Sequence, residues 1–259
     1  MKLTADNYYT PEANLEYFSV SQYKAFSKCE AAALAEIEGK YHRPETKALL
    51  MGSYVDAHFS GEMGVFIRDN PQIFNSRTGE LKAEYKQADK CVQRAESDPM
   101  FMSYMDGEKQ VIMTGELFGQ PWKVKLDVLH NDKIVDLKLM RDMKPVYTEN
   151  GWETFIDAWD YDVQAYVYQQ IVLQNTGKLL PFYFAIITKE EHPNIALIEM
   201  TQWKINSVEQ VMEHFVRERF ANVKAKQLDP IRCEHCDYCH DTKKLTTVIK
   251  YEDLLEDKL

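Results

Sequence analysis

Hydrophobic and polar residues alternate as in β-strands through the middle of the chain, and they follow a helical period on either side. The predicted strands are 111–118, 122–129, 133–139, 181–188 and 194–200. The predicted helices are 19–38, 46–64, 81–97, 155–177 and 205–227, with loops over 1–18, 65–80 and 142–155. Turn residues at 119–121 and 130–132 join the first three strands directly, so these strands are expected to be neighbours.

No linker, repeat or low-complexity run divides the chain, so its 259 residues, 45% of them hydrophobic, are expected to form one domain. No apolar stretch approaches the roughly 18 residues of a membrane helix. The N-terminus lacks the apolar core of a signal peptide, and a cytoplasmic location is therefore expected.

The formal charge of −10 argues against a protein whose main task is to coat nucleic acid. It is compatible with an enzyme whose active site is acidic. One predicted helix does carry a basic stripe, formed by Lys82, Lys86, Lys90 and Arg94. This stripe fits either contact with a phosphate backbone or a solvated helix face.

The candidate chemistry is concentrated in the central strands. Asp127 stands near the end of one predicted strand, and the triplet Asp136-Leu137-Lys138 lies in the next. Side chains alternate faces along a strand, so Asp136 and Lys138 point the same way, with Leu137 opposite them in the core. Carboxylates are the ligands that magnesium prefers. A surface hairpin with alternating charges is the alternative interpretation.

Two predicted helices carry further candidates. Gln164 and Tyr168 are four residues apart, so they project from one helix face and could hydrogen-bond a phosphate or a base. In the helix over 46–64, Asp56 and His58 are candidate ligands, and Gly52 suggests close packing against a neighbour.

Three of the five cysteines, Cys233, Cys236 and Cys239, follow the spacing C-x2-C-x2-C in a short polar segment, which favours a metal centre. The fourth ligand could be His235, His240 or the distant Cys29. A zinc site and an iron–sulfur cluster both fit this pattern. Cys91 has no partner by spacing and is interpreted as structural.

These motifs, in this order, resemble the RecB-like branch of the PD-(D/E)xK nucleases. The resemblance covers roughly residues 19–240. S-x-S-x4-F-x2-C at 19–29 and the cysteine triplet resemble the iron–sulfur members, namely AddB and the CRISPR-associated exonucleases. The core and Q-x3-Y motifs of the branch match Asp127, Asp136-Leu137-Lys138, Gln164 and Tyr168.

The resemblance implies an α/β fold with a restriction-endonuclease-like core, in which a central mixed β-sheet is flanked by helices. It implies that Asp127, Asp136 and the Leu137 carbonyl hold Mg²⁺ or Mn²⁺, and that Lys138 orients the attacking water. The family has G-x3-H on the early helix where this chain has Gly52-x3-Asp56, so Asp56 is the expected ligand, with His58 in reserve.

At the cysteines, the resemblance implies a 4Fe-4S cluster held by Cys29, Cys233, Cys236 and Cys239, with Zn²⁺ as the alternative. The cluster would tie the N-terminal helix over 19–39 to the segment 233–240.

The size of the chain and the absence of helicase motifs resemble phage exonucleases of the RecE type, similar to exodeoxyribonuclease VIII. The implied function is resection of double-stranded DNA ends for phage recombination, with a RecT-type annealing protein as partner and a possible homo-oligomeric ring. The alternatives are a structure-specific endonuclease on the same fold and a non-catalytic, zinc-containing nucleic-acid-binding module.

Overall fold

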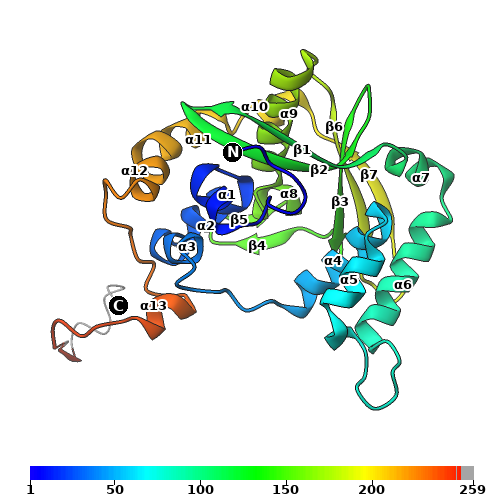
Figure 1. The fold of residues 1–259 in the computed structure, drawn as a ribbon, viewed down its shortest axis with the longest axis horizontal. Helices are drawn as coiled ribbons and strands as arrows, with labels where there is room; N and C mark the ends of the chain where they lie inside the picture. Colours follow the sequence, from blue (N-terminus) through cyan, green and yellow to red (C-terminus); the bar gives the residue numbers. More distant parts are fainter. Residues whose placement is uncertain (249, 252–259) are drawn as a thin grey trace.

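The molecule is organised around a five-stranded sheet with the strand order β1-β2-β3-β6-β7 (Figure 1). The computed structural model describes residues 1–248 and 250–251. The strands are β1 (Glu108–Leu117), β2 (Gln120–Leu129), β3 (Ile134–Met140), β6 (Phe182–Thr188) and β7 (Ile195–Glu199). β3 and β6 are parallel, while the other neighbouring strands are antiparallel. The predicted mixed sheet and its five strands are confirmed.

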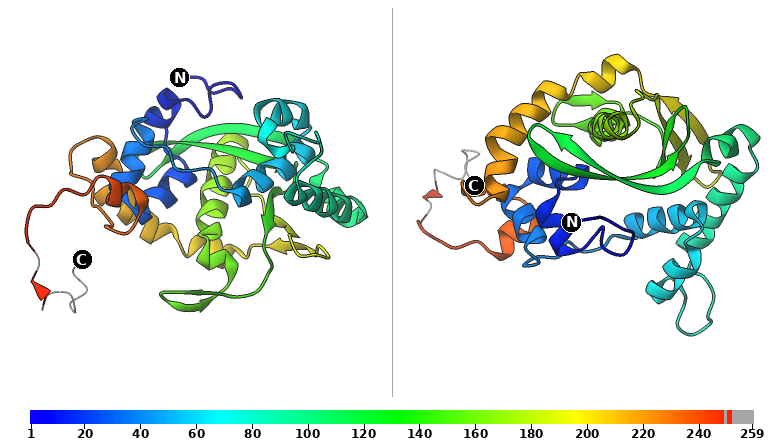
Figure 2. Two further views of the ribbon diagram at one scale, coloured as in Figure 1. Left: turned by 90° about the horizontal axis from the view of Figure 1, so that it is seen from below. Right: turned by 45° about the horizontal axis from the view of Figure 1, so that its top comes forward.

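One face of the sheet packs on α9 (Tyr161–Thr176), and the long β1–β2 hairpin curves around this helix (Figure 2). Gly115 permits the close approach, because a β-carbon there would collide with the side chains of Gln174 and Ile171. The other helices on this side are α2 (Val20–Lys28), α10 (Gln202–Asn206), α11 (Glu209–Phe215), the π-helical turn η2 (Val216–Phe220) and α12 (Ala221–Lys224).

The opposite face of the sheet packs on a separate group of helices. These are α4 (Lys47–Ser60), α5 (Met63–Asp69), the 3₁₀ turn η1 (Pro71–Ile73), α6 (Ala83–Glu96) and α7 (Pro99–Met105). Val135 and Leu137 of β3 point into this second core, whereas Ile134 points into the first. The predicted alternation of faces along β3 is therefore confirmed.

The remaining elements lie at the edges of these two layers. They are α1 (Pro11–Glu16), α3 (Glu30–Ile37), α8 (Phe155–Ala158), α13 (Asp237–Asp241) and a small hairpin of β4 (Val146–Thr148) and β5 (Gly151–Glu153). The β4–β5 hairpin projects from the body, and α13 lies beside α3 (Figures 1 and 2). Within the described part of the chain, no helix combines the length and apolarity needed to cross a membrane.

Several predicted boundaries are wrong, each for a local backbone reason. The predicted helix over 19–38 begins after its expected cap, Ser19, which accepts a hydrogen bond from the backbone of Gln22, but it divides at Cys29. Cys29 is extended, with a φ of −163°, so it joins α2 to α3 rather than lying within one helix. The helix over 155–177 likewise divides at Asp160, which has a φ of 51°.

Three other predictions also differ from the structure. The helix predicted over 205–227 begins at Gln202, because Thr201 caps its first turn. It is divided into α10, α11, η2 and α12. The predicted loop over 65–80 contains most of α5 and all of η1. The predicted loop over 142–155 contains the β4–β5 hairpin. Its polar and turn-forming residues are typical of a loop, so the two short strands were not predicted.

Candidate functional site

The predicted acidic site lies where β2 and β3 separate. We call this site, with the carboxylates of Asp56, Asp127 and Asp136, the acidic fork. The two strands pair only over residues 128–129 and 134–135. Beyond that point, the backbone N–H of Leu137 donates to Oδ2 of Asp127 at 2.8 Å instead of to a carbonyl of β2. Because the N–H and C=O of a strand residue point to the same side, the Leu137 carbonyl is directed into the same fork.

Asp136 is the most buried member of the site, with 2% of its surface exposed. Its Oδ1 accepts a hydrogen bond from Nε2 of Gln164 on α9 at 2.5 Å. Its Oδ2 lies 2.5 Å from Nζ of Lys138, yet this buried oxygen makes no hydrogen bond of good geometry. Burial of a carboxylate is costly unless a cation compensates its charge, and the Lys138 ammonium supplies one such cation here.

Asp56 enters the site from α4, on the other side of the fork. Its Oδ1 accepts a hydrogen bond from Nε2 of Gln110 on β1 at 3.1 Å. Gln110 has a φ of 53°, and this left-handed backbone occurs opposite Asp127 in the β1–β2 register. A non-glycine residue in this region is strained and is often found at functional sites.

His58, the reserve ligand, is engaged elsewhere. Its Nε2 lies 2.8 Å from Oε1 of Glu96 on α6, and both side chains are well exposed. The expectation of close packing at Gly52 is wrong, because a β-carbon there would meet nothing within 4 Å. Asp56, and not His58, therefore points towards Gln110 and the acidic fork. It lies one helical turn after Gly52, whose surroundings are open.

The electrostatics of the fork show an excess of negative charge. Burial raises the pKa of Asp127 well above its usual range, and the nearby carboxylates of Asp136 and Asp56 raise it further. Burial also raises the pKa of Asp56. Burial alone would lower the pKa of Lys138, but the carboxylates of Asp136 and Asp127 outweigh it and raise that pKa. Lys138 is therefore an ammonium at neutral pH.

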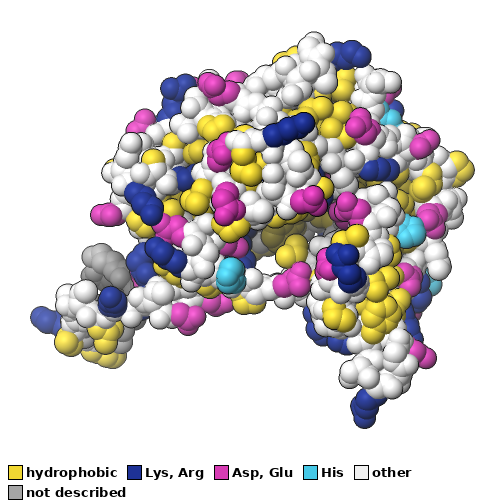
Figure 3. All heavy atoms as spheres, in the orientation of Figure 1, with side chains coloured by type: hydrophobic (Ala, Val, Ile, Leu, Met, Phe, Trp, Pro, Cys, Tyr) yellow, Lys and Arg dark blue, Asp and Glu magenta, His cyan; other side chains and the backbone are white. Residues whose placement is uncertain are grey.

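This charge pattern and the donor set fit a divalent cation. One oxygen of each carboxylate accepts a protein hydrogen bond, which fixes the side chain, while the second oxygen of Asp136 pairs with Lys138. Oxygen ligands of this kind suit Mg²⁺, which keeps several of its waters. Figure 3 shows that this face of the molecule is hollowed near its centre, between α2–α3 on one side and α4 on the other, with acidic side chains along the rim.

Tyr168 and Gln164 lie on the same side of α9, as their spacing predicts. Gln164 is bound to Asp136, as described above. Burial raises the pKa of the Tyr168 hydroxyl strongly, and the carboxylates of Asp136 and Asp127 contribute to the same shift. The two side chains therefore border the acidic fork together.

Sequence reasoning missed Lys24 and Tyr161, which form the far wall of the site. The ammonium groups of Lys24 and Lys138 lie 4.9 Å and 5.0 Å from the centroid of the Tyr161 ring. Lys24 also donates to the backbone carbonyl of Trp159 at 2.5 Å. Burial, and then the charge of Lys138, lower the pKa of Lys24 to about 8. The apolar stripe of the helix predicted over 19–38 gave no sign that Lys24 points inward.

The N-terminal segment supplies a third residue that sequence reasoning missed. Tyr9 is 69% exposed, and the ammonium of Lys125 on β2 lies 5.6 Å from its ring centroid. The pKa of Tyr9 is raised because its hydroxyl, although the residue is largely exposed, lies among many protein atoms and near the charges of Asp56 and Asp127. The segment before α1, which was predicted as part of a loop over residues 1–18, thus lies close to the acidic fork.

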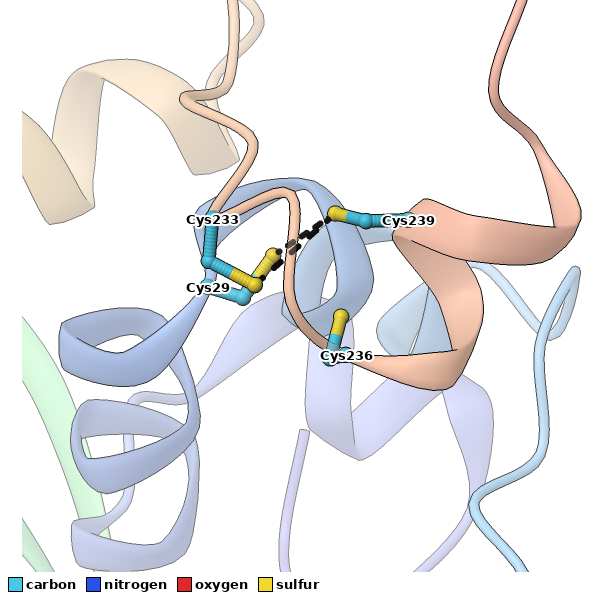
Figure 4. Close-up of side chains that lie close together, drawn as sticks. All are labelled: Cys29, Cys233, Cys236 and Cys239. Atoms are coloured by element: carbon cyan, nitrogen blue, oxygen red, sulfur yellow. Dashed lines mark hydrogen bonds between the residues drawn. The ribbon is translucent and has the colours of Figure 1, made fainter. Parts of the chain in front are cut away.

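The four predicted cysteines form a compact cluster. Cys29 comes from the junction of α2 and α3, and the other three come from the segment that includes α13 (Figure 4). The sulfur of Cys239 lies 3.6 Å from that of Cys29 and 3.9 Å from that of Cys233. All four sulfurs lie within 4.8 Å of one another. Cys29, and not His235 or His240, is therefore the fourth member.

The surroundings of the three C-terminal thiols act on them in opposite directions: burial raises the pKa of Cys236 to about 12 and also raises the pKa of Cys239. Burial would raise the pKa of Cys233, but hydrogen bonds from the backbone of His235 and Cys236 lower it to about 6. Cys91, in contrast, lies on α6 and donates to the carbonyl of Thr188 at 3.3 Å. Among the described residues, this close four-ligand arrangement occurs at the cysteines and not at the three carboxylates of the acidic fork.

A salt bridge reinforces the attachment of the cysteine segment. Glu30, which is 5% exposed, forms a two-point pair with the guanidinium of Arg219. The same carboxylate accepts a hydrogen bond from the backbone of Ile231 at 2.8 Å. The chain entering the cluster is thus held to the start of α3 by the hydrogen bond from Ile231 to Glu30 as well as by its cysteines.

Comparison with known proteins relates the chain to a protein family and to solved structures. The matching family is described as a PDDEXK-like domain of unknown function (DUF3799), and the match spans residues 19–242. The chain is also similar to the crystal structure of a candidate exonuclease from Eubacterium rectale, with 42% identity and a TM-score of 0.95 over 99% of each chain. No curated protein matches the chain. The matched span includes the acidic fork and the four cysteines.

Proposed function

Because this chain belongs to the family of PDDEXK-like domains, a nuclease fold, we propose that it is a deoxyribonuclease that degrades linear duplex DNA from its ends. The required metal is Mg²⁺ or Mn²⁺. The observation that carries this proposal is the convergence of the Asp127 and Asp136 carboxylates with the Lys138 ammonium where β2 and β3 separate. The exonuclease mode is supported by the similarity to the candidate exonuclease and by the RecE-like order of motifs.

The residues that would hold the metal are Asp56, Asp127 and Asp136, together with the carbonyl of Leu137. A bound divalent ion lowers the pKa of its water and neutralises charge on the scissile phosphate. Gln110 and Gln164 fix the carboxylates of Asp56 and Asp136 by hydrogen bonds.

Lys138 and Tyr168 act on the substrate side of the fork. Lys138 carries its proton at neutral pH, so it donates to the attacking water or to a phosphate oxygen and is not the general base. Tyr168, from the same helix as Gln164, positions the strand. Preorganised charge of this kind contributes about 100-fold or more to a rate.

The test is digestion of end-labelled linear duplex DNA beside a covalently closed circle, with Mg²⁺ and with EDTA. We expect Mg²⁺-dependent loss of the linear substrate alone. Lys138→Ala should lower the rate at least about 100-fold with an unchanged circular dichroism spectrum. Lys133→Ala, just before β3, is the matched control and should keep full activity. Cutting of the circle would replace this proposal with an endonuclease, and no cleavage by folded protein would favour a binding module.

For the cysteine site we propose a single Zn²⁺ ion in place of the cluster that the family resemblance favours. Four sulfurs around one zinc at the usual Zn–S distance lie about 3.8 Å apart. Two of the observed pairs are 3.6 Å and 3.9 Å apart, and every pair lies within 4.8 Å. In a cubane cluster each thiolate binds a different iron, so the sulfurs must stand farther apart. The zinc would join the first helices to the C-terminal segment.

Metal analysis of protein purified without added metals tests this assignment. We expect about one zinc per chain, and a tetrahedral cobalt spectrum after exchange with Co²⁺. About four irons per chain, with broad visible absorption that bleaches on reduction, would contradict it. The RecT-type partner and the homo-oligomeric ring remain predictions of the resemblance, and no observation in this structure adds to them.

A further inference from the structure

A second cavity adjoins the acidic fork at the end of β3. Its volume is about 430 Å³, and it is lined by residues that directly follow Lys138 on the strand. Tyr161 forms part of its wall, and the same ring lies 5.0 Å from the ammonium of Lys138. The cavity and the fork therefore share one side chain. A space of this size is ample for a nucleotide.

The position of the cavity follows from the topology of the sheet. β3 and β6 are the parallel pair, so their carboxyl ends meet at one edge. The backbone N–H of Lys189, just after β6, donates to the carbonyl of Met140 at 2.7 Å and closes that edge. In α/β sheets, ligands commonly bind outside the carboxyl ends of parallel strands.

The lining of the cavity suits one unit of a single DNA strand. Arg141, Lys144 and Lys189 bring three positive charges, against one negative charge from Asp142. Trp159 lines the same space and is 47% exposed. Cationic side chains beside an exposed indole are the combination that holds a phosphate and stacks a base in single-strand-binding proteins.

Aromatic side chains continue beyond the cavity. Val146 of β4 lines it, and the next residue, Tyr147, is 71% exposed. Tyr147 stands against Trp152 of β5, with 5.5 Å between ring centroids, and Trp152 is 74% exposed. The projecting hairpin thus extends the stacking surface away from the body.

The neighbouring cavity on the other side of α8 has the opposite charge. Its lining includes Glu149, Glu153, Asp157 and Asp160, and its one lysine, Lys204, pairs with Asp157 at 2.5 Å. A phosphate backbone is repelled there. This acidic cavity, to which the β4–β5 hairpin contributes Glu149 and Glu153, is therefore less favourable for a DNA strand than the cavity at the end of β3.

We propose that the cavity at the end of β3 binds the nucleotide of single-stranded DNA next to the scissile phosphate, with Trp159 stacking on the base and Lys144 and Lys189 holding the backbone. The strand then passes onto the Tyr147–Trp152 pair. This inference rests on the proposed nuclease function for its position beside the scissile bond, although the binding itself needs no cleavage.

The experiment measures binding of a fluorescent single-stranded oligonucleotide by anisotropy in EDTA, where no cleavage occurs. Trp159→Ala should weaken binding about 5- to 150-fold, the range for loss of one stacked base. The double variant Lys144→Ala/Lys189→Ala should weaken it similarly and reduce the salt dependence. The controls are Trp203→Ala, an indole 79% exposed on α10, and Lys86→Ala/Lys90→Ala on the basic stripe of α6.

Unchanged binding in the Trp159 and lysine variants would overturn the proposal, as would equal losses in the two controls or no binding by the wild type. Trp159→Phe, which keeps a stacking ring, should recover most of the affinity and so separates stacking from misfolding. A protein that binds in this way but never cleaves would refute the nuclease function and leave this inference standing. A protein that cleaves linear DNA, but whose Trp159 and lysine variants bind as tightly as the wild type, would support the nuclease function and refute this inference.

Discussion

The acidic fork and the cysteine cluster are both candidate metal sites, yet they are built in opposite ways. In the fork, three carboxylates come from three elements, and each has one oxygen fixed by a protein hydrogen bond. In the cluster, four sulfurs already lie within 4.8 Å of one another. The fork is open and under-compensated in charge, whereas the cluster is closed.

This difference corresponds to the distinction between catalytic and structural metal sites. A catalytic site keeps positions for water and substrate, and a structural site uses all its ligands for the protein. The fork also concentrates unfavourable features, including raised carboxyl pKa values and the left-handed backbone of Gln110. The cluster instead ties distant parts of the chain together, alongside the Glu30–Arg219 pair. A substitution in one of these sites should therefore leave the other site unchanged.

The largest effect is expected from Asp136→Asn. The amide can still accept the hydrogen bond from Gln164, but it lacks the charge that a divalent ion requires. Cleavage of linear DNA should fall by about 100- to 1,000-fold at saturating Mg²⁺. Zinc content and thermal stability should not fall. A loss of zinc in this variant would show that the two sites are not independent.

Loss of a cysteine ligand is expected to have the next largest effect, and it acts on stability. Cys29→Ser should release the metal and lower the free energy of unfolding by about 2–4 kcal/mol. For a chain of this size that is a drop in Tm of roughly 4–16 °C. The control is Cys91→Ser, which removes a buried cysteine outside the cluster and should retain zinc. Equal zinc loss in both variants would contradict the assignment of Cys29.

Asp56→Ala and His58→Ala test which residue of α4 completes the fork. Asp56→Ala should lower the rate about 10- to 100-fold and raise the Mg²⁺ concentration needed for half-maximal activity. His58→Ala should change neither, since His58 pairs with Glu96 on the surface. The assay is a Mg²⁺ titration of both variants. The reverse ranking would return the metal-holding role to His58.

The smallest effect concerns the protein without metal. The raised pKa of Asp127 means that the native state holds a proton over a pH range in which the unfolded chain has lost it. The free energy of unfolding in EDTA should therefore fall as pH rises through that range. Asp127→Asn keeps an acceptor for the Leu137 N–H and removes this dependence.

Thermal unfolding in EDTA at pH 5 and pH 8 measures this effect. At pH 8, Asp127→Asn should be more stable than the wild type by about 1 kcal/mol, or roughly 2–4 °C in Tm. Mg²⁺ should stabilise the wild type, increasingly so at higher pH, and should not stabilise the variant. A variant less stable than the wild type in EDTA at both pH values would refute this account of the charge in the fork.

Sequence patterns predicted the framework better than the details of the fork. Asp127 and the Asp136-Leu137-Lys138 triplet could be placed because strand alternation and short turns are local signals. The break at Cys29 could not, since the helical pattern continues across it. The inward direction of Lys24, the left-handed Gln110 and the approach of Tyr9 all depend on contacts between distant segments. Periodicity carries no information about such contacts.

The most direct test of two separate metal sites is to measure zinc content and DNA cleavage in one preparation after brief EDTA treatment and gel filtration. We expect that about one zinc per chain remains, that cleavage is absent, and that Mg²⁺ alone restores cleavage fully. Cleavage that persists without added divalent metal would contradict the account. So would activity that returns with Zn²⁺ and not with Mg²⁺.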